Sequence, residues 1–401
     1  MQRPLLQFVL FIAVFSLIIG AGHYYLWSRL VRAPELSPTW HRVGTWGLGA
    51  AAVMVPVGLF LIPELPRRAG TILGMIVYGW VGVAMLLVFL LFASEVVRVA
   101  VHLASSAASS GPADEGRRTF LSRGIAAVVG VLALGIAGVG AASALGEVAV
   151  RSVRVSLRRL SSGMSGFRVV QLTDVHIGPT LGREWLASIV DRVNALEPDL
   201  IVITGDLVDG SVEALRDHVA PLASLRSKHG TYFVTGNHEY YSGVDAWMAE
   251  LKRLGVRVLR NERVTIGEGD DAFDLAGVDD WASKGFGGGH GPNLARALEG
   301  RDPKREVILL AHQPKQIREA AALGVGLQIS GHTHGGQIFP WTLFVRLDQP
   351  YIAGLSQHEG TQIYVSRGTG YWGPPMRVAA PAEITVLELT SGAAANASET
   401  V

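Results

Sequence analysis

Several polar residues that can donate oxygen or nitrogen to a metal ion follow directly after short apolar runs in the second half of the chain. Asp, Asn and His side chains suit hard or borderline divalent cations. These donors are more than a single four-coordinate zinc needs, and they are enough for two ions that share a bridging carboxylate. The candidate metal ligands are Asp174, His176, Asp206, Asn237, His312, His332 and His334.

The pattern around these donors predicts a buried sheet that positions them. Apolar runs at residues 167–172, 200–204 and 232–234 alternate with helical patterns, which is typical of βαβ units. In open α/β sheets the carboxyl ends of the strands meet at the crevice that binds the ligand. We therefore expect the donors to converge on one rim of the sheet.

The local backbone around the donors gives two further expectations. In Asp174-x-His176 and His332-x-His334, an extended segment of period two would turn both side chains the same way. A glycine stands just before several donors, as expected where the backbone turns sharply and approaches an ion closely. These glycines are Gly205, Gly236 and Gly331.

Later apolar runs have fewer helices between them and predict a second sheet. These runs lie at residues 273–276, 307–311, 327–330, 362–366 and 384–389. The alternation at residues 153–157 predicts the strand that opens the folded domain. We therefore expect an α/β domain over residues 151–390, followed by a small, polar tail at 391–401 that composition predicts to be disordered.

The first 150 residues have the composition of a multispan membrane region. Four stretches without Asp, Glu, Lys or Arg are each long enough to cross a bilayer core of roughly 30 Å. They predict an all-α region with about four transmembrane helices, at residues 4–28, 44–63, 69–94 and 124–146. The second, which contains Pro56, is the weakest of the four.

The arginines around these stretches predict which side the folded domain occupies. If the chain has four spans and the folded domain lies outside, the inner loops hold seven arginines. The outer segments that precede the folded domain hold three, so this orientation agrees with the positive-inside rule. The domain is therefore expected to be extracytoplasmic on a multi-pass cell-membrane protein. Arg117-Arg118 before the last stretch also resembles a twin-arginine export signal, although arginines at the inner end of an ordinary span would look the same.

Composition excludes other classes of protein. The chain has no cysteine, which excludes disulfide scaffolds, Cys-ligated metal sites and a thiol nucleophile. A formal net charge of +1 and scattered lysines give no basic surface for a nucleic acid, so no nucleic acid partner is expected. No specific protein partner is predicted.

The order and spacing of the motifs resemble the calcineurin-like metallophosphoesterase superfamily over about residues 167–389. The motifs are Asp174-x-His176, Gly205-Asp206, Gly236-Asn237-His238-Glu239, His312 and Gly331-His332-x-His334. The segment after His334 and the Ser366-Arg367-Gly368 stretch most resemble the bacterial membrane-attached or twin-arginine-exported branch. The resemblance implies an αββα sandwich of two sheets.

The resemblance also implies a role for each matched residue. One metal ion would take Asp174, His176, Asp206 and His334. The other would take Asp206, Asn237, His312 and His332, so that Asp206 bridges the two. His238 matches the catalytic position that faces the substrate.

These roles predict a membrane-anchored, metal-dependent phosphoric ester hydrolase. Two divalent ions, Mn, Fe or Zn, would activate a metal-bridging hydroxide for attack on phosphorus. Attachment to a membrane favours a phosphodiester or a lipid-linked phosphate or pyrophosphate as substrate. The alternative is a catalytically silent membrane sensor or scaffold that keeps the metal-binding fold, although no ligand position is lost. A transporter is disfavoured because the predicted spans carry no charged residue in their interiors.

For several neighbouring residues the sequence allows more than one role. Asp209 is expected to cap a helix or form a turn rather than to act in catalysis. Glu239 is a candidate to orient His238. Tyr240, Tyr241 and Trp281 could line a substrate pocket or simply pack. Arg367 and Arg377 could hold a phosphate or form ordinary surface ion pairs.

Overall fold

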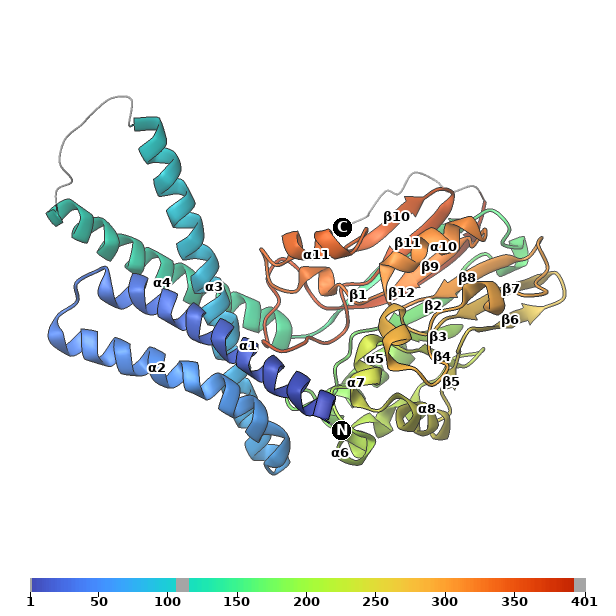
Figure 1. The fold of residues 1–401 in the computed structure, drawn as a ribbon. Helices are drawn as coiled ribbons and strands as arrows, with labels where there is room; N and C mark the ends of the chain where they lie inside the picture. Colours follow the sequence, from blue (N-terminus) through green and yellow to red (C-terminus); the bar gives the residue numbers. More distant parts are fainter. Residues whose placement is uncertain (1, 106–114, 393–401) are drawn as a thin grey trace. The chain divides into compact units, whose positions relative to one another are not determined.

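The computed structural model describes residues 2–105 and 115–392, without the side chains of residues 2–9, 11, 102, 105 and 115. The chain divides into two compact units (Figure 1). One contains Met1–Ala142 with Gly373–Met376, and the other contains Ser143–Trp372 with Arg377–Val401. The first is helical, and the second carries the sheets.

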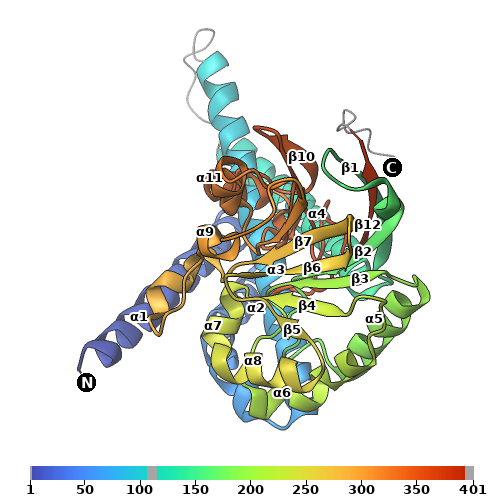
Figure 2. The same cartoon turned by 90° about the vertical axis from the view of Figure 1, so that its right-hand side faces the viewer.

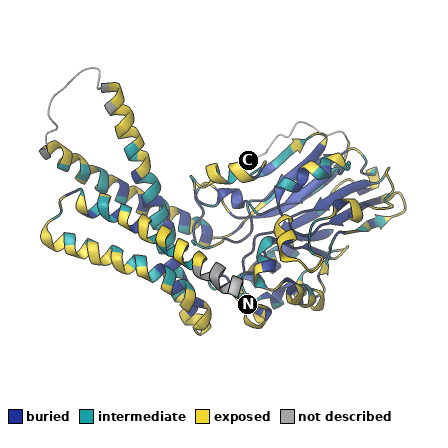
Figure 3. Ribbon diagram, viewed as in Figure 1, coloured by how far each residue is buried: buried dark blue, intermediate teal, exposed yellow. Residues whose placement is uncertain are grey.

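The helical unit is built from four long helices and two short helical segments. These are α1 (Gln2–Trp27), the π-helix η1 (Ser28–Arg32), α2 (Pro38–Leu61), η2 (Ile62–Glu64), α3 (Arg67–Ser105) and α4 (Glu115–Leu145). Many apolar side chains on the described parts of these helices are exposed (Figure 3). A lipid environment explains this exposure, because soluble proteins rarely leave so much contiguous apolar surface uncovered.

Three of these helical stretches have the length and composition to cross a membrane: Pro38–Glu64, Arg67–Val101 and Gly116–Leu145. In the most apolar 18-residue segment of each stretch, only 17%, 28% and 22% of the residues are buried within the protein. They contain the stretches predicted at residues 44–63 and 69–94, and nearly all of 124–146. The first predicted span, 4–28, falls on α1, but many of its side chains lie outside the described residues, so this span stays a prediction.

The first sheet of the second unit is mostly parallel. Its order is β1-β12-β2-β3-β4-β5, with β12 antiparallel to β2 and the other pairs parallel. The strands are β1 (Ala149–Leu157), β12 (Glu383–Ser391), β2 (Phe167–Leu172), β3 (Leu200–Thr204), β4 (Thr231–Val234) and β5 (Arg257–Val258). Helices α5 (Arg183–Ala195), α6 (Val212–Val219) and α8 (Val244–Arg253) cover one face (Figure 2).

The second sheet has the order β10-β11-β9-β8-β7-β6, with an antiparallel pair at each end. Its strands are β10 (Gly354–His358), β11 (Thr361–Val365), β9 (Leu327–Ser330), β8 (Glu306–Leu310), β7 (Asp271–Gly277) and β6 (Glu262–Glu268). The short helices α9 (Leu294–Ala297) and α10 (Ile317–Ala322) pack on its outer face. The predicted second sheet is therefore confirmed for the runs at 273–276, 307–311, 327–330 and 362–366. The run at 384–389 was wrongly assigned to it, because it forms β12 of the first sheet, where it pairs with β1 and β2.

The core lies in three layers because successive strand residues point to opposite faces. Val169 packs between the two sheets, whereas its neighbour Val170 faces the helices of the first sheet. Likewise Ile308 joins the inter-sheet core and Leu309 packs under α10. The domain is thus an αββα sandwich, as expected.

The domain boundaries predicted at residues 150 and 390 remain predictions. Helix α4 ends at Leu145 and β1 begins at Ala149, while β12 continues to Ser391. Residues 393–401, which make up most of the predicted disordered tail, lie outside the described residues.

Candidate metal centre

The strand register places the candidate ligands at the carboxyl ends of neighbouring parallel strands in each sheet. In the first sheet, Leu172 pairs with Ile203, and Thr204 pairs with Val234. In the second sheet, Leu310 of β8 pairs with Ile329 of β9. The segments after these strands carry Asp174, His176, Asp206, Asn237, His312, His332 and His334. The predicted convergence is therefore realised, although the ligand role of each residue stays a prediction.

The backbone of these segments is not extended, so the expectation drawn from the period-two pattern was wrong. Five of the donors have left-handed backbone conformations. Asp174, His176, Asp206, His332 and His334 have φ of 51°, 51°, 51°, 72° and 51°. Such conformations cost about 1–3 kcal/mol per residue and cluster at active sites. Strands β2, β3 and β9 therefore end in sharp turns, and these turns, rather than a continued pleat, orient the side chains.

The glycines before the donors allow the backbone to approach neighbouring donor side chains closely, as expected. A Cβ atom at Gly331 would collide with the side chains of Thr173 and Asp174. A Cβ atom at Gly236 would collide with the carboxylate of Asp206. Any side chain at these two positions would therefore push the neighbouring donor out of place.

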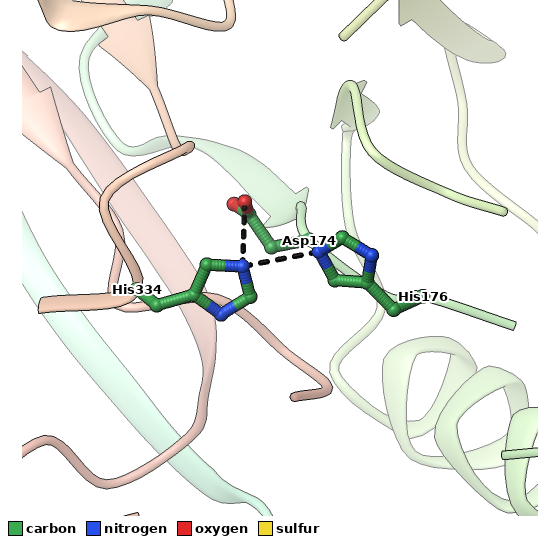
Figure 4. A group of neighbouring side chains, drawn as sticks. All are labelled: Asp174, His176 and His334. Carbon is green, nitrogen blue, oxygen red and sulfur yellow. Dashed lines mark hydrogen bonds and ion pairs between the residues drawn. The ribbon is translucent and has the colours of Figure 1, made fainter. Parts of the chain in front are cut away.

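One group of donors consists of Asp174, His176 and His334 (Figure 4). Nε2 of His334 lies 3.0 Å from Nε2 of His176 and 3.3 Å from Oδ1 of Asp174. Two imidazole nitrogens and a carboxylate oxygen thus face one another in a buried space. This arrangement suits a cation, because at most one proton could be shared between the two ring nitrogens.

A second group consists of Asp206, His312 and His332. Nε2 of His312 lies 3.0 Å from Oδ2 of Asp206 and 3.2 Å from Nδ1 of His332. Nδ1 of His312 lies 2.7 Å from the Thr204 carbonyl oxygen, to which it can donate, and this leaves Nε2 free to act as a ligand.

Asn237 supplies the most direct sign that an ion belongs here. Its Oδ1 atom is buried and has no hydrogen-bond partner among the described residues. Buried polar atoms are nearly always satisfied, so an orphaned amide oxygen needs an explanation. A cation bound at this position would provide its missing partner, and the residues present therefore fit a metal.

The electrostatics of the buried donors also favour a cation. Burial alone would raise the pKa of Asp206, but the positive charge of His312 holds it well below its usual value. Burial and the charge of His312 lower the pKa of His332 to about 3, and burial lowers that of His334 well below normal. Burial and the repulsion from Asp206 raise the pKa of Asp174. Burial alone would lower the pKa of His312, but the charges of Asp206 and Asp174 instead raise it well above its usual value. The site thus combines buried carboxylates with the neutral imidazoles of His332 and His334, whose lone pairs are free.

Asp206 is shared by two clusters of potential ligands. Besides the group with His312 and His332, it lies in a cluster with His176 and His238. Nε2 of His238 is 4.0 Å from Oδ2 of Asp206. His238 therefore lies beside the candidate metal site, and its role toward a substrate stays a prediction.

Asp209 was expected to cap a helix or form a turn, and the structure corrects this. Its Oδ1 atom lies 2.5 Å from Nδ1 of His238, and its Oδ2 atom lies 3.1 Å from Nδ1 of His176. Burial alone would lower the pKa of His238, but the charge of Asp206 and the hydrogen bond to Asp209 raise it to about 9. The spacing Gly205-Asp206-x-x-Asp209 was the available signal.

Glu239 does not orient His238, contrary to the suggested role. Its carboxylate accepts backbone N–H groups from Asp206 at 3.0 Å, Leu207 at 2.8 Å and Gly236 at 2.7 Å. It therefore ties the loop after β3 to the loop after β4. Burial, together with the nearby charge of Asp206, raises the pKa of Glu239 to about 7.

The aromatic candidates divide into packing and surface residues. Tyr240 is buried, and its ring contacts Phe286. Tyr241 is exposed and lies edge-on to His238 at 5.5 Å between ring centroids. Trp372, which no sequence motif singles out, lies edge-on to the same ring at 5.5 Å between ring centroids. Tyr241 and Trp372 therefore flank the candidate catalytic residue.

Neither arginine candidate forms a phosphate site or an ordinary surface ion pair. Arg377 is 1% exposed, and its guanidinium donates to the carbonyl oxygens of His334, Arg367, Gly370 and Ala380. Arg367 donates to the buried Glu383 at 3.2 Å. Arg377 thus fixes the backbone of the His334 loop.

Comparison with known proteins agrees with this geometry. Residues 167–336 match the model of the family described as calcineurin-like phosphoesterase. A Bos taurus protein named transmembrane protein with metallophosphoesterase domain is 40% identical over 96% of this chain and 89% of its own length. A Danio rerio protein of the same name is 34% identical over 96% of this chain and 90% of its own length. An uncharacterized metallophosphoesterase of Helicobacter pylori strain J99 is 45% identical over 55% of this chain and 59% of its own length.

The fold, the clustered donors and these similarities define a metal-dependent phosphoric ester hydrolase. The chain belongs to the calcineurin-like metallophosphoesterase superfamily. The names of its full-length relatives, together with its three apolar helices, support a membrane protein.

Proposed function

We propose that the protein is a membrane-anchored dinuclear-metal phosphoesterase that acts on phosphodiesters or on lipid-linked phosphate or pyrophosphate. The observation that carries the proposal is the orphaned Oδ1 atom of Asn237 beside the buried His and Asp donors. A catalytically silent scaffold would be expected to have lost at least one ligand position. All the ligand positions that the family resemblance implies are filled here.

The donors separate into two ion sites around Asp206. One ion would be held by Asp174, His176, Asp206 and His334, and the other by Asp206, Asn237, His312 and His332. Two such divalent ions, Mn, Fe or Zn, would supply Lewis-acid activation of the attacking water and neutralise charge on the phosphoryl group. The protein contributes the shared carboxylate and the imidazole ligands.

His238 acts on the substrate from the open side of this site. Asp209 accepts the hydrogen bond of its Nδ1 atom, so the Nε2 atom is turned toward Asp206. A proton on Nε2 can be donated to a phosphoryl oxygen or to the leaving oxygen as the P–O bond breaks. Asp209 is therefore a positioning residue, and His238 is the candidate catalytic residue.

Exposed apolar residues near the site support a lipid-linked substrate. Trp372 is 55% exposed beside His238. Gln337 donates to the Trp372 carbonyl at 2.8 Å and accepts from its backbone N–H at 3.0 Å. The chain after Gln337 carries further exposed apolar side chains up to and within helix α11 (Thr342–Asp348). These are Phe339, Trp341, Leu343, Phe344 and Leu347.

The anchoring and its sidedness are part of the proposal. Four spans and the excess of inner arginines would place the phosphoesterase domain outside the cytoplasm. We also propose a relationship to the bacterial exported branch, in which Arg117-Arg118 resembles a twin-arginine signal. A reporter fused after Leu389 tests this orientation, and activity of a reporter that works only in the cytoplasm would contradict it.

The enzymatic proposal is tested on the full-length protein in detergent micelles. Manganese-dependent hydrolysis is measured with bis(p-nitrophenyl) phosphate, with p-nitrophenyl phosphate, and with diacylglycerol pyrophosphate in mixed micelles. Bound metal per chain is counted in parallel. Asp206→Asn is the test variant, and Asp191→Asn, which changes an exposed residue of α5, is the matched control.

We expect turnover that is lost in Asp206→Asn and kept in Asp191→Asn. Preference for the diester or the lipid pyrophosphate would support the proposed substrate class, whereas preference for the monoester would contradict it. A single bound ion per chain in the active protein would contradict the dinuclear site.

A further inference from the structure

The helical unit contains a basic cavity that the phosphoesterase reaction does not use. It has a volume of about 410 Å³ and is lined by the end of α1 with η1, by α3 and by α4. Among its lining residues are Arg29, Arg32, Arg98, Arg118, Ser94 and Ser122. All of them are distant in sequence from the metal ligands.

Helical spacing explains why these side chains meet. On α3, Leu91, Ser94 and Arg98 are three and four residues apart and therefore share one face. On α4, Arg118 and Ser122 share a face in the same way. Each helix thus presents a serine and an arginine to the cavity, while Leu91 is buried and forms part of an apolar floor.

The segment between α1 and α2 completes the wall. Arg29 and Arg32 lie in the π-helix η1, a type of local irregularity that is frequent at functional sites. Arg123 of α4 donates to the carbonyl oxygens of Pro34 at 2.8 Å and Glu35 at 2.9 Å. The loop after η1 is therefore held against α4 rather than left free.

The charges of the cavity are not balanced. Glu95 accepts from Arg29 at 2.7 Å and from the Tyr25 hydroxyl at 2.9 Å, so its carboxylate is already engaged. Among the side chains that the structure describes, which do not include that of Glu115, no ion pair joins Arg32, Arg98 or Arg118 to a carboxylate. The lining holds four arginines against Glu35 and Glu95, which gives a formal charge of +2.

This arrangement differs from arginines that only mark the inner end of a span. Such arginines need no common cavity, because each can reach the headgroups independently. Here guanidinium groups from three separate helical segments surround one space that serine side chains also line. The Ser94 hydroxyl donates to the Leu91 carbonyl oxygen at 2.7 Å, so the guanidinium groups are the donors that face the space. Guanidinium donors beside the buried Leu91 match a phosphate that is attached to acyl chains.

We propose that this cavity binds the phosphate of an anionic phospholipid, as a structural lipid site separate from the phosphoesterase site. In the proposed topology these arginines lie on the cytoplasmic side, where anionic lipids give the leaflet its negative charge. Basic pockets between transmembrane helices on that side recognise such headgroups. The lipid would bridge α1, α3 and α4.

The test uses the purified full-length protein and native mass spectrometry. Phosphatidylglycerol and phosphatidylcholine are titrated in separate samples, and a third sample receives phosphatidylglycerol with excess inorganic phosphate. The cavity variant carries Arg32→Gln, Arg98→Gln and Arg118→Gln. The control carries Arg42→Gln, Arg68→Gln and Arg117→Gln, which removes the same charge from helical residues outside the cavity lining.

We expect phosphatidylglycerol to be retained more strongly than phosphatidylcholine, and the cavity variant to lose at least about tenfold in affinity while the control keeps it. Equal losses in both variants would reduce the effect to general charge and overturn the proposal. Displacement of the lipid by inorganic phosphate would also overturn it, because the cavity would then be a site for free phosphate.

Two further variants separate misfolding and catalysis from lipid binding. Arg98→Lys keeps the charge, and we expect it to retain most of the lipid if the cavity variant fails only through lost charge. Asp206→Asn, which is expected to abolish hydrolysis, should bind phosphatidylglycerol as the unmodified protein does. Loss of lipid in Asp206→Asn would place the lipid in the phosphoesterase site and contradict the separate cavity.

Discussion

The Oδ1 atom of Asp209 lies 2.5 Å from Nδ1 of His238, while its second carboxylate oxygen lies 3.1 Å from Nδ1 of His176. One carboxylate thus orients the candidate catalytic residue and one candidate metal ligand. Hydrogen bonding of this kind fixes which ring nitrogen is free to bind a metal or a substrate. Asp209 therefore links the orientation of the His238 ring to the geometry of the candidate metal site.

Replacement of Asp209 by Asn should lower turnover by about 10- to 100-fold, because both imidazoles lose the carboxylate that orients them. The measurement is kcat and KM on the diester, with metal content determined for the same sample. We expect kcat to fall more than KM rises. Unchanged kcat at full metal occupancy would show that Asp209 does not position His238, and Asp217→Asn on the exposed surface of α6 is the control.

Replacement of Asn237 by Ala should remove one of the two ions. The buried Oδ1 atom has no partner in the described structure, so the change removes a ligand without breaking a hydrogen bond of that oxygen. Metal content is measured after dialysis against limiting manganese, and the expected count falls from two ions to one. Asn237→Asp, which keeps an oxygen donor at the same place, should restore the second ion; two retained ions in the Ala variant would refute the assignment.

Removal of metal should destabilise the phosphoesterase domain. Ions that bind only the folded state stabilise it by about 2.7 kcal/mol at about 100 times the dissociation constant. Thermal melting of the full-length protein is followed before and after chelation and again after manganese is restored. We expect a reversible rise in Tm with manganese that is much smaller in Asp206→Asn, and an equal rise in both would mean that manganese acts elsewhere.

Replacement of Arg377 by Met should destabilise the domain by at least about 3 kcal/mol, because several buried carbonyl oxygens lose a charged donor. The Nη1 atom alone donates to the carbonyl oxygens of His334 at 3.0 Å and Ala380 at 3.2 Å. Chemical denaturation measures the loss, with Arg318→Met on the exposed surface of α10 as control. A loss no greater than that of the control would show that Arg377 does not hold the His334 loop.

Much of the fold followed from the pattern of apolar residues. The strands predicted at 167–172, 200–204 and 327–330 match β2, β3 and β9. The hairpin partner β6 and the edge strand β10 were not predicted, since their sequences alternate weakly and border polar residues. The insertion of β12 between β1 and β2 could not be predicted, because strand order depends on pairing between residues more than 200 positions apart.

Residue type alone selected the candidate metal donors, since few functions other than metal binding place Asp, Asn and His at the ends of successive strands. Type alone was not enough for Asp209, Glu239 and Arg377, which carry charges that suit several roles. The structure decided among those roles through proximity: Asp209 reaches two imidazoles, Glu239 three backbone N–H groups, and Arg377 buried carbonyl oxygens.

The sequence by itself determined the class of protein, the candidate donors and the apolar helices, because periodicity, ligand chemistry and bilayer length are local properties of the chain. The tertiary structure alone decided the left-handed turns that aim Asp174 and His334, the aromatic residues beside His238, and the basic cavity among the helices. These features depend on contacts between segments that are distant in sequence. Such contacts form only when burial of the shared core determines the register of the strands and which face each helix turns toward its neighbours.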